Sequence, residues 1–266
     1  MSAGYSNKLV KNMFANKKDK KSSFIIYITG GYPDLKTTKN LILQLDKAGV
    51  DVIEIGVPFS DPVADGPVIQ ESSFYALQKG VTLVKILALT RELKSKINAA
   101  VVLMGYYNSF LKYGLGKFVT GCKNNGIDGI IIPDLVPEES GVLYKLAKKN
   151  DLSMVFLVAP NSTDKRIKLA AGRSSGFLYC VSVKGITGQR KKLPEIEKYI
   201  GRVKKITDLP LAVGFGVSNN KQAKHFLKSA DGVIIGSAVI KILKDSKGKN
   251  AVQKVVRFVK SLRKGM

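Results

Sequence analysis

The sequence predicts an α/β protein that folds as a (β/α)8 TIM barrel with an extra N-terminal helix. Two observations lead to this fold class. Short apolar runs alternate with amphipathic stretches, and eight such strand and helix pairs follow one another along 266 residues. No linker or low-complexity insertion interrupts the alternation. We therefore expect a single domain over residues 1–266, with a lysine-rich helix and linker at 1–23 and the barrel at 24–266.

The elements follow from the period of the apolar residues. Strands are expected at 24–29, 52–55, 100–104, 129–132, 154–158, 177–181, 211–213 and 232–235. Helices are expected near 6–16, 37–48, 83–96, 115–124, 138–149, 165–170, 193–207, 221–228 and 251–262. Gly49, Gly126 and Asn150 each come just after one of these helices, where C-cap residues belong.

Composition excludes several classes of protein. No run of about 18 uncharged apolar residues is present, so no membrane span is expected. The first 23 residues lack the apolar core of a secretory signal, which favours a soluble intracellular protein. The net charge of +24 comes from 37 lysines and seven arginines spread over the predicted helices, whereas a nucleic-acid groove favours arginine and interleaved aromatic residues. We expect no specific nucleic-acid binding, and only a general attraction for an anionic substrate.

Metal-binding and disulfide-rich classes are excluded by the same count. Cys122 and Cys180 form no metal-ligand spacing, and His225 is the only histidine. A site built on several histidines or cysteines is therefore not expected, and we predict no metal.

The segment 51–70 carries the clearest sign of chemistry. Glu54 lies within an apolar strand, where a charged residue is costly without a partner or a function. The loop after it contains three prolines and a glycine in eleven residues, which predicts a rigid loop that carries Asp61 and Asp65 back toward the strand end. Two acids in unlike surroundings suit proton transfer, but local chemistry does not decide between the two aspartates.

Two glycine-rich turns follow the seventh and eighth predicted strands, at 214–218 and 236–237. Glycine lets the backbone approach a ligand, and these are the loops with which such barrels hold phosphate. The segment 182–190, which has two glycines and little apolar content, predicts a mobile lid.

Several spaced motifs resemble those of tryptophan synthase alpha subunits, from about residue 24 to the last helix. The longest is EIGVPFSDPVADGP, from Glu54 to Pro67, which corresponds to the family signature ELGVPFSDP-ADGP. Further matches are Thr29-Gly30-Gly31-Tyr32-Pro33, Met104-Gly105-Tyr106-Tyr107-Asn108, Gly185-Ile186-Thr187-Gly188 and Gly214-Phe215-Gly216. The resemblance implies a lyase that cleaves indole-3-glycerol phosphate to indole and glyceraldehyde 3-phosphate.

The resemblance also assigns roles to residues. Glu54 would shuttle protons, and Asp65, held ionised by loop N–H donors, would bind the indole N–H. The remaining matches are substrate-binding Tyr27, Met104, Ile131, Tyr179, Thr187 and Phe215, phosphate-binding Gly188, Gly216, Gly236 and Ser237, and partner-facing Asp61 and Pro62. From the sequence alone, ordinary barrel core is the favoured interpretation of the pocket residues Tyr27, Met104, Ile131, Tyr179 and Phe215.

The same resemblance implies no cofactor in this chain and a pyridoxal-phosphate beta subunit as partner in an α2β2 complex. Stand-alone lyases share the motifs, and Leu135-Val136-Pro137 departs from the usual proline position at a loop near the partner. The bias toward lysine, isoleucine and asparagine suits a plastid-encoded protein, so we expect the plastid stroma, with the bacterial cytoplasm as the alternative.

Three rival functions are weaker. A Schiff-base aldolase would use Lys184 after the sixth strand, but its substrate needs a carbonyl group, which indole-3-glycerol phosphate lacks. An epimerase acting on a sugar phosphate would need a metal or a different acid pair. A non-catalytic basic scaffold has no use for a buried carboxylate beside a phosphate site.

Overall fold

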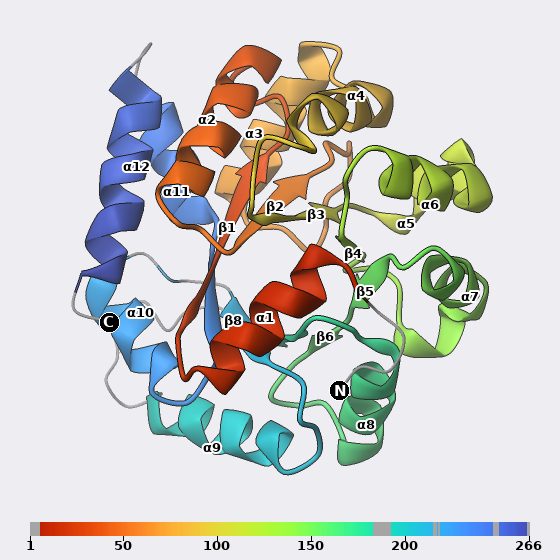
Figure 1. The fold of residues 1–266 in the computed structure, drawn as a ribbon, viewed down its shortest axis with the longest axis vertical. Helices are drawn as coiled ribbons and strands as arrows, with labels where there is room; N and C mark the ends of the chain where they lie inside the picture. Colours follow the sequence, from red (N-terminus) through yellow and green to blue (C-terminus); the bar gives the residue numbers. More distant parts are fainter. Residues whose placement is uncertain (1–5, 183–192, 215–216, 218, 247–249, 265–266) are drawn as a thin grey trace.

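The computed structural model describes residues 6–182, 193–214, 217, 219–246 and 250–264. Nine parallel strands form one nearly closed sheet with the order β5-β4-β3-β2-β1-β9-β8-β7-β6. The strands are β1 (Ser23–Thr29), β2 (Val52–Gly56), β3 (Ala100–Met104), β4 (Gly129–Ile131), β5 (Ser153–Val155), β6 (Leu157–Val158), β7 (Leu178–Val181), β8 (Leu211–Gly214) and β9 (Gly232–Ile235). The helices pack around the strands (Figure 1), which confirms the predicted barrel.

The predicted fifth strand, 154–158, is divided in two. Phe156 interrupts it, because its N–H donates to Ser174 Oγ (3.0 Å) and not to a neighbouring strand. Its carbonyl still accepts from the N–H of Tyr179 (3.1 Å). Since β5 pairs with β4 and β6 pairs with β7, this interrupted strand closes the ring. Nine observed strands thus correspond to eight barrel strands.

The helices in the described part of the chain lie close to the predicted positions, with additions. They are α1 (Lys8–Lys18), α2 (Leu35–Lys47), α3 (Pro67–Gln78), α4 (Leu83–Leu93), α5 (Tyr107–Tyr113), α6 (Leu115–Asn124), α7 (Gly141–Lys149), α8 (Asp164–Arg173), α9 (Leu193–Lys204), α10 (Asn220–Leu227), α11 (Ser237–Lys244) and α12 (Asn250–Arg263), with a 3-10 turn at Pro137–Glu139. None of them has the length and apolar character needed to cross a membrane.

Three helices, α3, α5 and α11, were not predicted. In α3 the usual pattern is inverted, since Ser72 and Ser73 are buried while Phe74 is exposed. Helix α5 has seven residues, and α11 has eight directly after Gly236, where we predicted only a glycine-rich turn. Short or inverted apolar patterns give no helical period to detect.

Helix α1 lies across the N-terminal ends of the strands (Figure 1). Leu9 and Met13 on its inner face are fully buried. A Cβ added at Gly129 or at Gly176 would lie 2.8 Å or 2.7 Å from an atom of the Leu9 side chain, so α1 packs directly on the strand ends. This end of the barrel is therefore closed, and the opposite end is left for a site.

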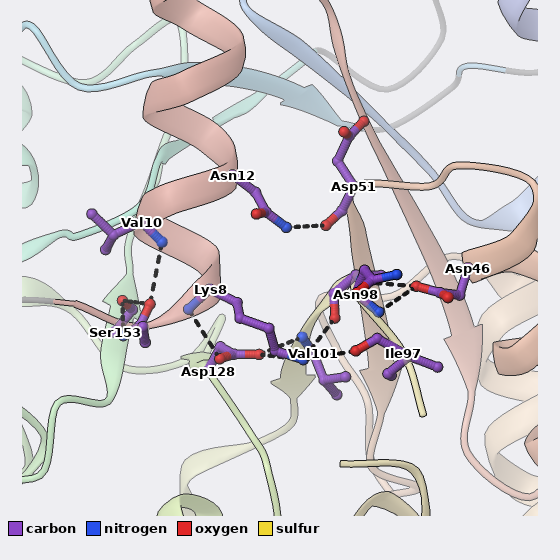
Figure 2. Close-up of polar contacts among 12 residues, drawn as sticks. Lys8, Val10, Asn12, Asp46, Asp51, Ile97, Asn98, Val101, Asp128 and Ser153 are labelled. Atoms are coloured by element: carbon purple, nitrogen blue, oxygen red, sulfur yellow. Dashed lines mark hydrogen bonds and ion pairs between the residues drawn. The ribbon is translucent and has the colours of Figure 1, made fainter. Parts of the chain in front are cut away.

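At these ends, three aspartates that each precede a strand accept hydrogen bonds from the N–H groups of the neighbouring strands. The Oδ2 atom of Asp51 accepts from Phe24 N–H (2.8 Å), and that of Asp128 accepts from Val101 N–H (2.9 Å). Asp231 accepts from Leu211 N–H in the same way (2.8 Å). Figure 2 shows Asp51 and Asp128 also contacting α1: Asn12 Nδ2 donates to the Asp51 carbonyl, and the N–H of Lys8 donates to Asp128 (3.2 Å).

Candidate active site

Glu54 lies in the middle of β2, in register with Tyr27 of β1 and Val102 of β3. Glu54 is 1% exposed, and its Oε2 atom is buried with no hydrogen-bond partner among the described residues. Burial, and secondarily the charge of Asp65, raises the pKa of Glu54 to about 8. Glu54 is therefore mainly protonated at neutral pH and is able to donate a proton.

The structure gives different surroundings to the two aspartates between which local chemistry did not decide. Asp61 is exposed, whereas Asp65 is 8% exposed and lies close enough to Glu54 to raise its pKa. Burial raises the pKa of Asp65 itself to about 6, against the opposing effect of a hydrogen bond from Tyr106. Asp65 is thus mainly ionised at pH 7, and a buried anion stands beside a buried acid.

The group that stabilises Asp65 differs from the one we expected. We predicted N–H donors of the loop, but within the described residues the carboxylate accepts from the hydroxyl of Tyr106, at 3.1 Å from Oδ2. Tyr106 follows β3, the neighbour of β2 in the sheet. We assigned Tyr106 no role from the sequence, because its contact with Asp65 depends on the pairing of β2 with β3.

The loop between β2 and α3 makes hydrogen bonds to β3 and within itself. Val57 N–H donates to the Met104 carbonyl (2.7 Å), and Asp65 N–H donates to that of Pro62 (2.9 Å). The Gln70 amide donates to the carbonyl of Asp65 (3.0 Å). Pro62 is buried within the loop, so Asp61 and the neighbouring Val63 face outward.

The predicted pocket residues in the described part of the chain, Tyr27, Met104, Ile131 and Tyr179, are all buried. A side chain at Gly56 would collide with the Tyr27 ring, and one at Gly214 would collide with the Tyr179 ring. Burial raises the pKa of both phenols, and the charges of Glu54 and Asp65 raise it further. Both tyrosines are thus close to the acid pair.

Two of the residues predicted to bind phosphate lie at the start of α11. Gly236 precedes this helix and Ser237 is its first residue. A Cβ at Gly236 would lie 3.1 Å from Cβ of Tyr27, so the turn passes close to the pocket wall. The first N–H groups of a helix lack partners within it and suit an anion. The other predicted residues, Thr187, Gly188, Phe215 and Gly216, lie outside the described residues, as do Lys184 and most of the proposed lid.

A separate groove of about 790 Å³ lies on the outside of the barrel, between α2 and α12. Its lining residues are Lys36, Thr37, Asn40, Gln44, Val252, Gln253, Val256 and Arg257. It contains neither acid of the pair, so it is not part of this site. Among the described residues no group of three or more metal-ligating side chains is present.

Known proteins resemble this chain over nearly its whole length. A family model described as tryptophan synthase alpha chain matches residues 13–266. The chain belongs to this family. The tryptophan synthase alpha chain of Petrotoga mobilis is 45% identical over 258 residues, covering 96% of this chain and 98% of that protein.

Solved structures of the tryptophan synthase family have the same fold. The subunit alpha from Legionella pneumophila has a TM-score of 0.90 at 33% identity, and the match covers 97% of each chain. Tryptophan synthase from Mycobacterium tuberculosis in an aminoacrylate-bound form has a TM-score of 0.86 at 32% identity, covering 97% of this chain and 98% of that one.

Membership of the tryptophan synthase alpha chain family confirms the predicted enzyme class. Its members are the lyase subunits that cleave indole-3-glycerol phosphate in tryptophan biosynthesis. The alpha chain of this family carries no cofactor, and pyridoxal phosphate belongs to the beta subunit. The relatives named above come from bacteria, so the comparisons give no support to a plastid.

Proposed function

We propose that Glu54 and Asp65 together carry the cleavage of indole-3-glycerol phosphate in this chain. The reaction breaks the bond between C3 of the indole ring and the first carbon of the glycerol side chain. It needs a proton at C3, a negative charge near the ring N–H, and a base for the side-chain hydroxyl that becomes the aldehyde. A neutral buried carboxyl group beside a buried carboxylate meets these needs.

Glu54 acts as the proton shuttle. In its protonated form it donates to C3, which makes the ring a cationic indolenine and weakens the carbon–carbon bond. The resulting Glu54 carboxylate then accepts the proton of the side-chain hydroxyl as the bond breaks. The carboxyl group is thereby protonated again, and no other proton donor is required. Its pKa of about 8 supports both directions of transfer near neutral pH.

Asp65 acts as a fixed charge. Its carboxylate accepts the indole N–H and favours the cationic ring that forms when C3 is protonated. The pocket residues Tyr27, Met104, Ile131 and Tyr179, with Phe215 and Thr187, would enclose the substrate. Gly236 and Ser237 would hold the phosphate at the start of α11, together with Gly188 and Gly216.

One observation carries this proposal: the Oε2 atom of Glu54 is buried and has no hydrogen-bond partner among the described residues. A buried polar atom without a partner is costly, so a functional reason for it is required. The direct test is to supply indole-3-glycerol phosphate to the full chain and to measure both products. Indole and glyceraldehyde 3-phosphate should form in equal amounts, and formation of neither would contradict the proposal.

A second experiment distinguishes this mechanism from that of a Schiff-base aldolase. If Lys184 formed an imine with a carbonyl substrate, borohydride would trap a covalent adduct at that residue. We expect no adduct after treatment in the presence of indole-3-glycerol phosphate. An adduct at Lys184 would replace our mechanism by that of a Schiff-base aldolase.

For this chain we propose a tryptophan synthase beta subunit as partner in an α2β2 complex. Exposed apolar side chains support a docking surface: Val63 is 80% exposed, Leu111 is 51% exposed and Val142 is 66% exposed. They follow β2, β3 and β4, which are neighbouring strands, and so belong to the same end of the barrel as the acids. Asp61 lies beside Val63 and would contact the partner, while buried Pro62 shapes the loop.

Location is proposed from two opposing observations. The lysine, isoleucine and asparagine bias supports the plastid stroma, which we first expected. The bacterial origin of the relatives supports the bacterial cytoplasm. We propose the bacterial cytoplasm, because similarity over nearly the whole chain is more specific than composition.

A further inference from the structure

Tyr106 makes three contacts with the loop that carries Asp65. Its hydroxyl accepts the N–H of Ala64 (2.9 Å) and donates to Oδ2 of Asp65 (3.1 Å). Its ring stacks on Phe59, with centroids 5.0 Å apart and planes 17° from parallel. One side chain, projecting from the end of β3, thus contacts the beginning and the end of this loop.

The two hydrogen bonds fix the direction of the hydroxyl proton. A phenol has one proton, and the Ala64 N–H occupies one of its acceptor positions. The proton of Tyr106 is therefore directed at Asp65. Burial and the charge of Asp65 raise the pKa of this phenol, so it remains a donor throughout the working range of pH.

The Tyr106 ring packs on Phe59, which is itself hydrogen-bonded to α3. Phe59 N–H donates to Ser73 Oγ (2.9 Å), and that hydroxyl donates to the Phe59 carbonyl (3.1 Å), which ties Phe59 to α3. The stacked Tyr106 ring thus rests on a fixed partner. Within the described residues the Asp65 carboxylate uses Oδ2 for its hydrogen bond, which leaves Oδ1 to accept the indole N–H.

We propose that Tyr106 is a positioning residue, which holds the Asp65 carboxylate in place and stabilises its charge while the other carboxylate oxygen binds the indole N–H. This inference rests on the proposed role of Asp65. The loop that Tyr106 contacts through Phe59 and Ala64 also carries the outward-facing residues Asp61 and Val63.

The test is Tyr106→Phe in the full chain, which keeps the ring and removes the hydroxyl. Loss of a hydrogen bond to a charged group should lower kcat roughly tenfold. KM should change by less than about twofold, since the pocket shape is kept. The hydrogen bond favours the ionised form of Asp65, so its loss should raise the pKa of that group and move the acid limb of the pH profile to higher pH.

Other titratable groups near Asp65 are unchanged in this variant. Glu54 and Tyr27 come from β2 and β1, and Tyr179 comes from β7. A merely structural role for Tyr106 would lower activity equally at every pH. Tyr107→Phe is the matched control, because the backbone N–H of Tyr107 and not its hydroxyl contacts Asp134 (2.9 Å). The control should leave kcat and the acid limb unchanged.

A double variant separates this inference from the proposed function. In an Asp65→Asn background, Tyr106→Phe should have little further effect, because Tyr106 acts through the carboxylate. If Asp65→Asn alone kept full activity, the role of Asp65 would be wrong. If Asp65→Asn were inactive but Tyr106→Phe kept the kcat and acid limb of the wild type, only the role of Tyr106 would be wrong.

Phe59→Leu provides a second variant in case Tyr106→Phe folds poorly. It removes the stacked ring and leaves the Tyr106 hydroxyl in place. We expect a smaller fall in kcat and a smaller shift of the acid limb in the same direction. A wild-type kcat and an unshifted acid limb in Phe59→Leu would overturn the inference.

Discussion

At the scale of single residues, burial divides two carboxyl groups into an acid and an anion. Glu54 is more deeply buried and lacks a hydrogen-bond partner among the described residues for Oε2, whereas Asp65 receives the Tyr106 hydroxyl. Their pKa values, about 8 and about 6, leave a range of pH in which Glu54 is protonated and Asp65 is ionised. The first step of the proposed reaction requires this combination.

This difference predicts a bell-shaped dependence of kcat/KM on pH. Activity should rise as pH passes about 6, because Asp65 loses its proton and gains the needed charge. It should fall as pH passes about 8, because Glu54 loses the proton that it donates to C3. Steady-state rates of indole formation between pH 5 and pH 10 would check both limbs. A profile that only rises across this range would contradict Glu54 as the initial acid.

A second residue-scale prediction concerns the two aspartates. Asp65→Asn should lower kcat by roughly 100-fold or more, as does loss of a group that stabilises transition-state charge. Asp61→Asn should leave the activity of the chain alone within about twofold, because the Asp61 side chain is exposed. Both rates are to be measured without a partner. Equal losses in the two variants would reverse our assignment.

The sequence predicted these acids because each stands out locally. Glu54 interrupts an apolar strand, and the prolines around Asp65 mark a rigid loop. Tyr106 gave no such signal, since its importance depends on a contact with Asp65 that exists only when β2 and β3 lie side by side. Local chemistry did not decide between Asp61 and Asp65; the family resemblance implied Asp65, and only the structure shows that Asp65 is buried and Asp61 exposed.

At the scale of elements, the strands were predictable because buried parallel strands are continuous apolar runs. The break at Phe156 was not, because the hydroxyl that binds its N–H comes from Ser174, after α8. Helix α11 was not predicted because it has only eight residues and directly follows the glycine-rich turn that we expected to bind phosphate. The local pattern of apolar residues therefore predicted where the strands lie, whereas the break at Phe156 depends on a tertiary contact.

The aspartates before the strands give a prediction about stability. Asp128→Ala should lower the free energy of unfolding by about 1–3 kcal/mol, because the buried N–H of Val101 loses its acceptor. Glu138→Ala is the control: its ion pair with Arg166 is exposed, and its loss should cost less than about 1 kcal/mol. Urea unfolding of both variants measures the difference. Equal losses would show that the strand-end hydrogen bond adds nothing.

At the scale of the whole molecule, one end of the barrel is closed by packing and the other end carries the acid pair. Helix α1 covers the N-terminal ends of the strands, and the acids, the Tyr106 contact and the start of α11 belong to the opposite end. The exposed apolar residues Val63, Leu111 and Val142 share that second end. A partner that docks there would contact the loop that holds Asp65.

This arrangement predicts activation by the partner. Addition of a tryptophan synthase beta subunit should raise the rate of indole release from indole-3-glycerol phosphate at least tenfold, by ordering the loop beyond what Tyr106 achieves. Asp61→Asn should reduce this activation more than it reduces the activity of the chain alone. A rate that does not change with the beta subunit would favour the stand-alone lyase.

The central claim is that Glu54 transfers the protons of the cleavage. Glu54→Gln keeps the shape and the neutral form of the side chain but can neither donate an acidic proton nor accept one. Indole release and the affinity for indole-3-glycerol phosphate should be measured on the same preparation, by absorbance and by calorimetry. Our account predicts that indole release is abolished while binding stays within about threefold of wild type. Turnover equal to that of the wild type would contradict it.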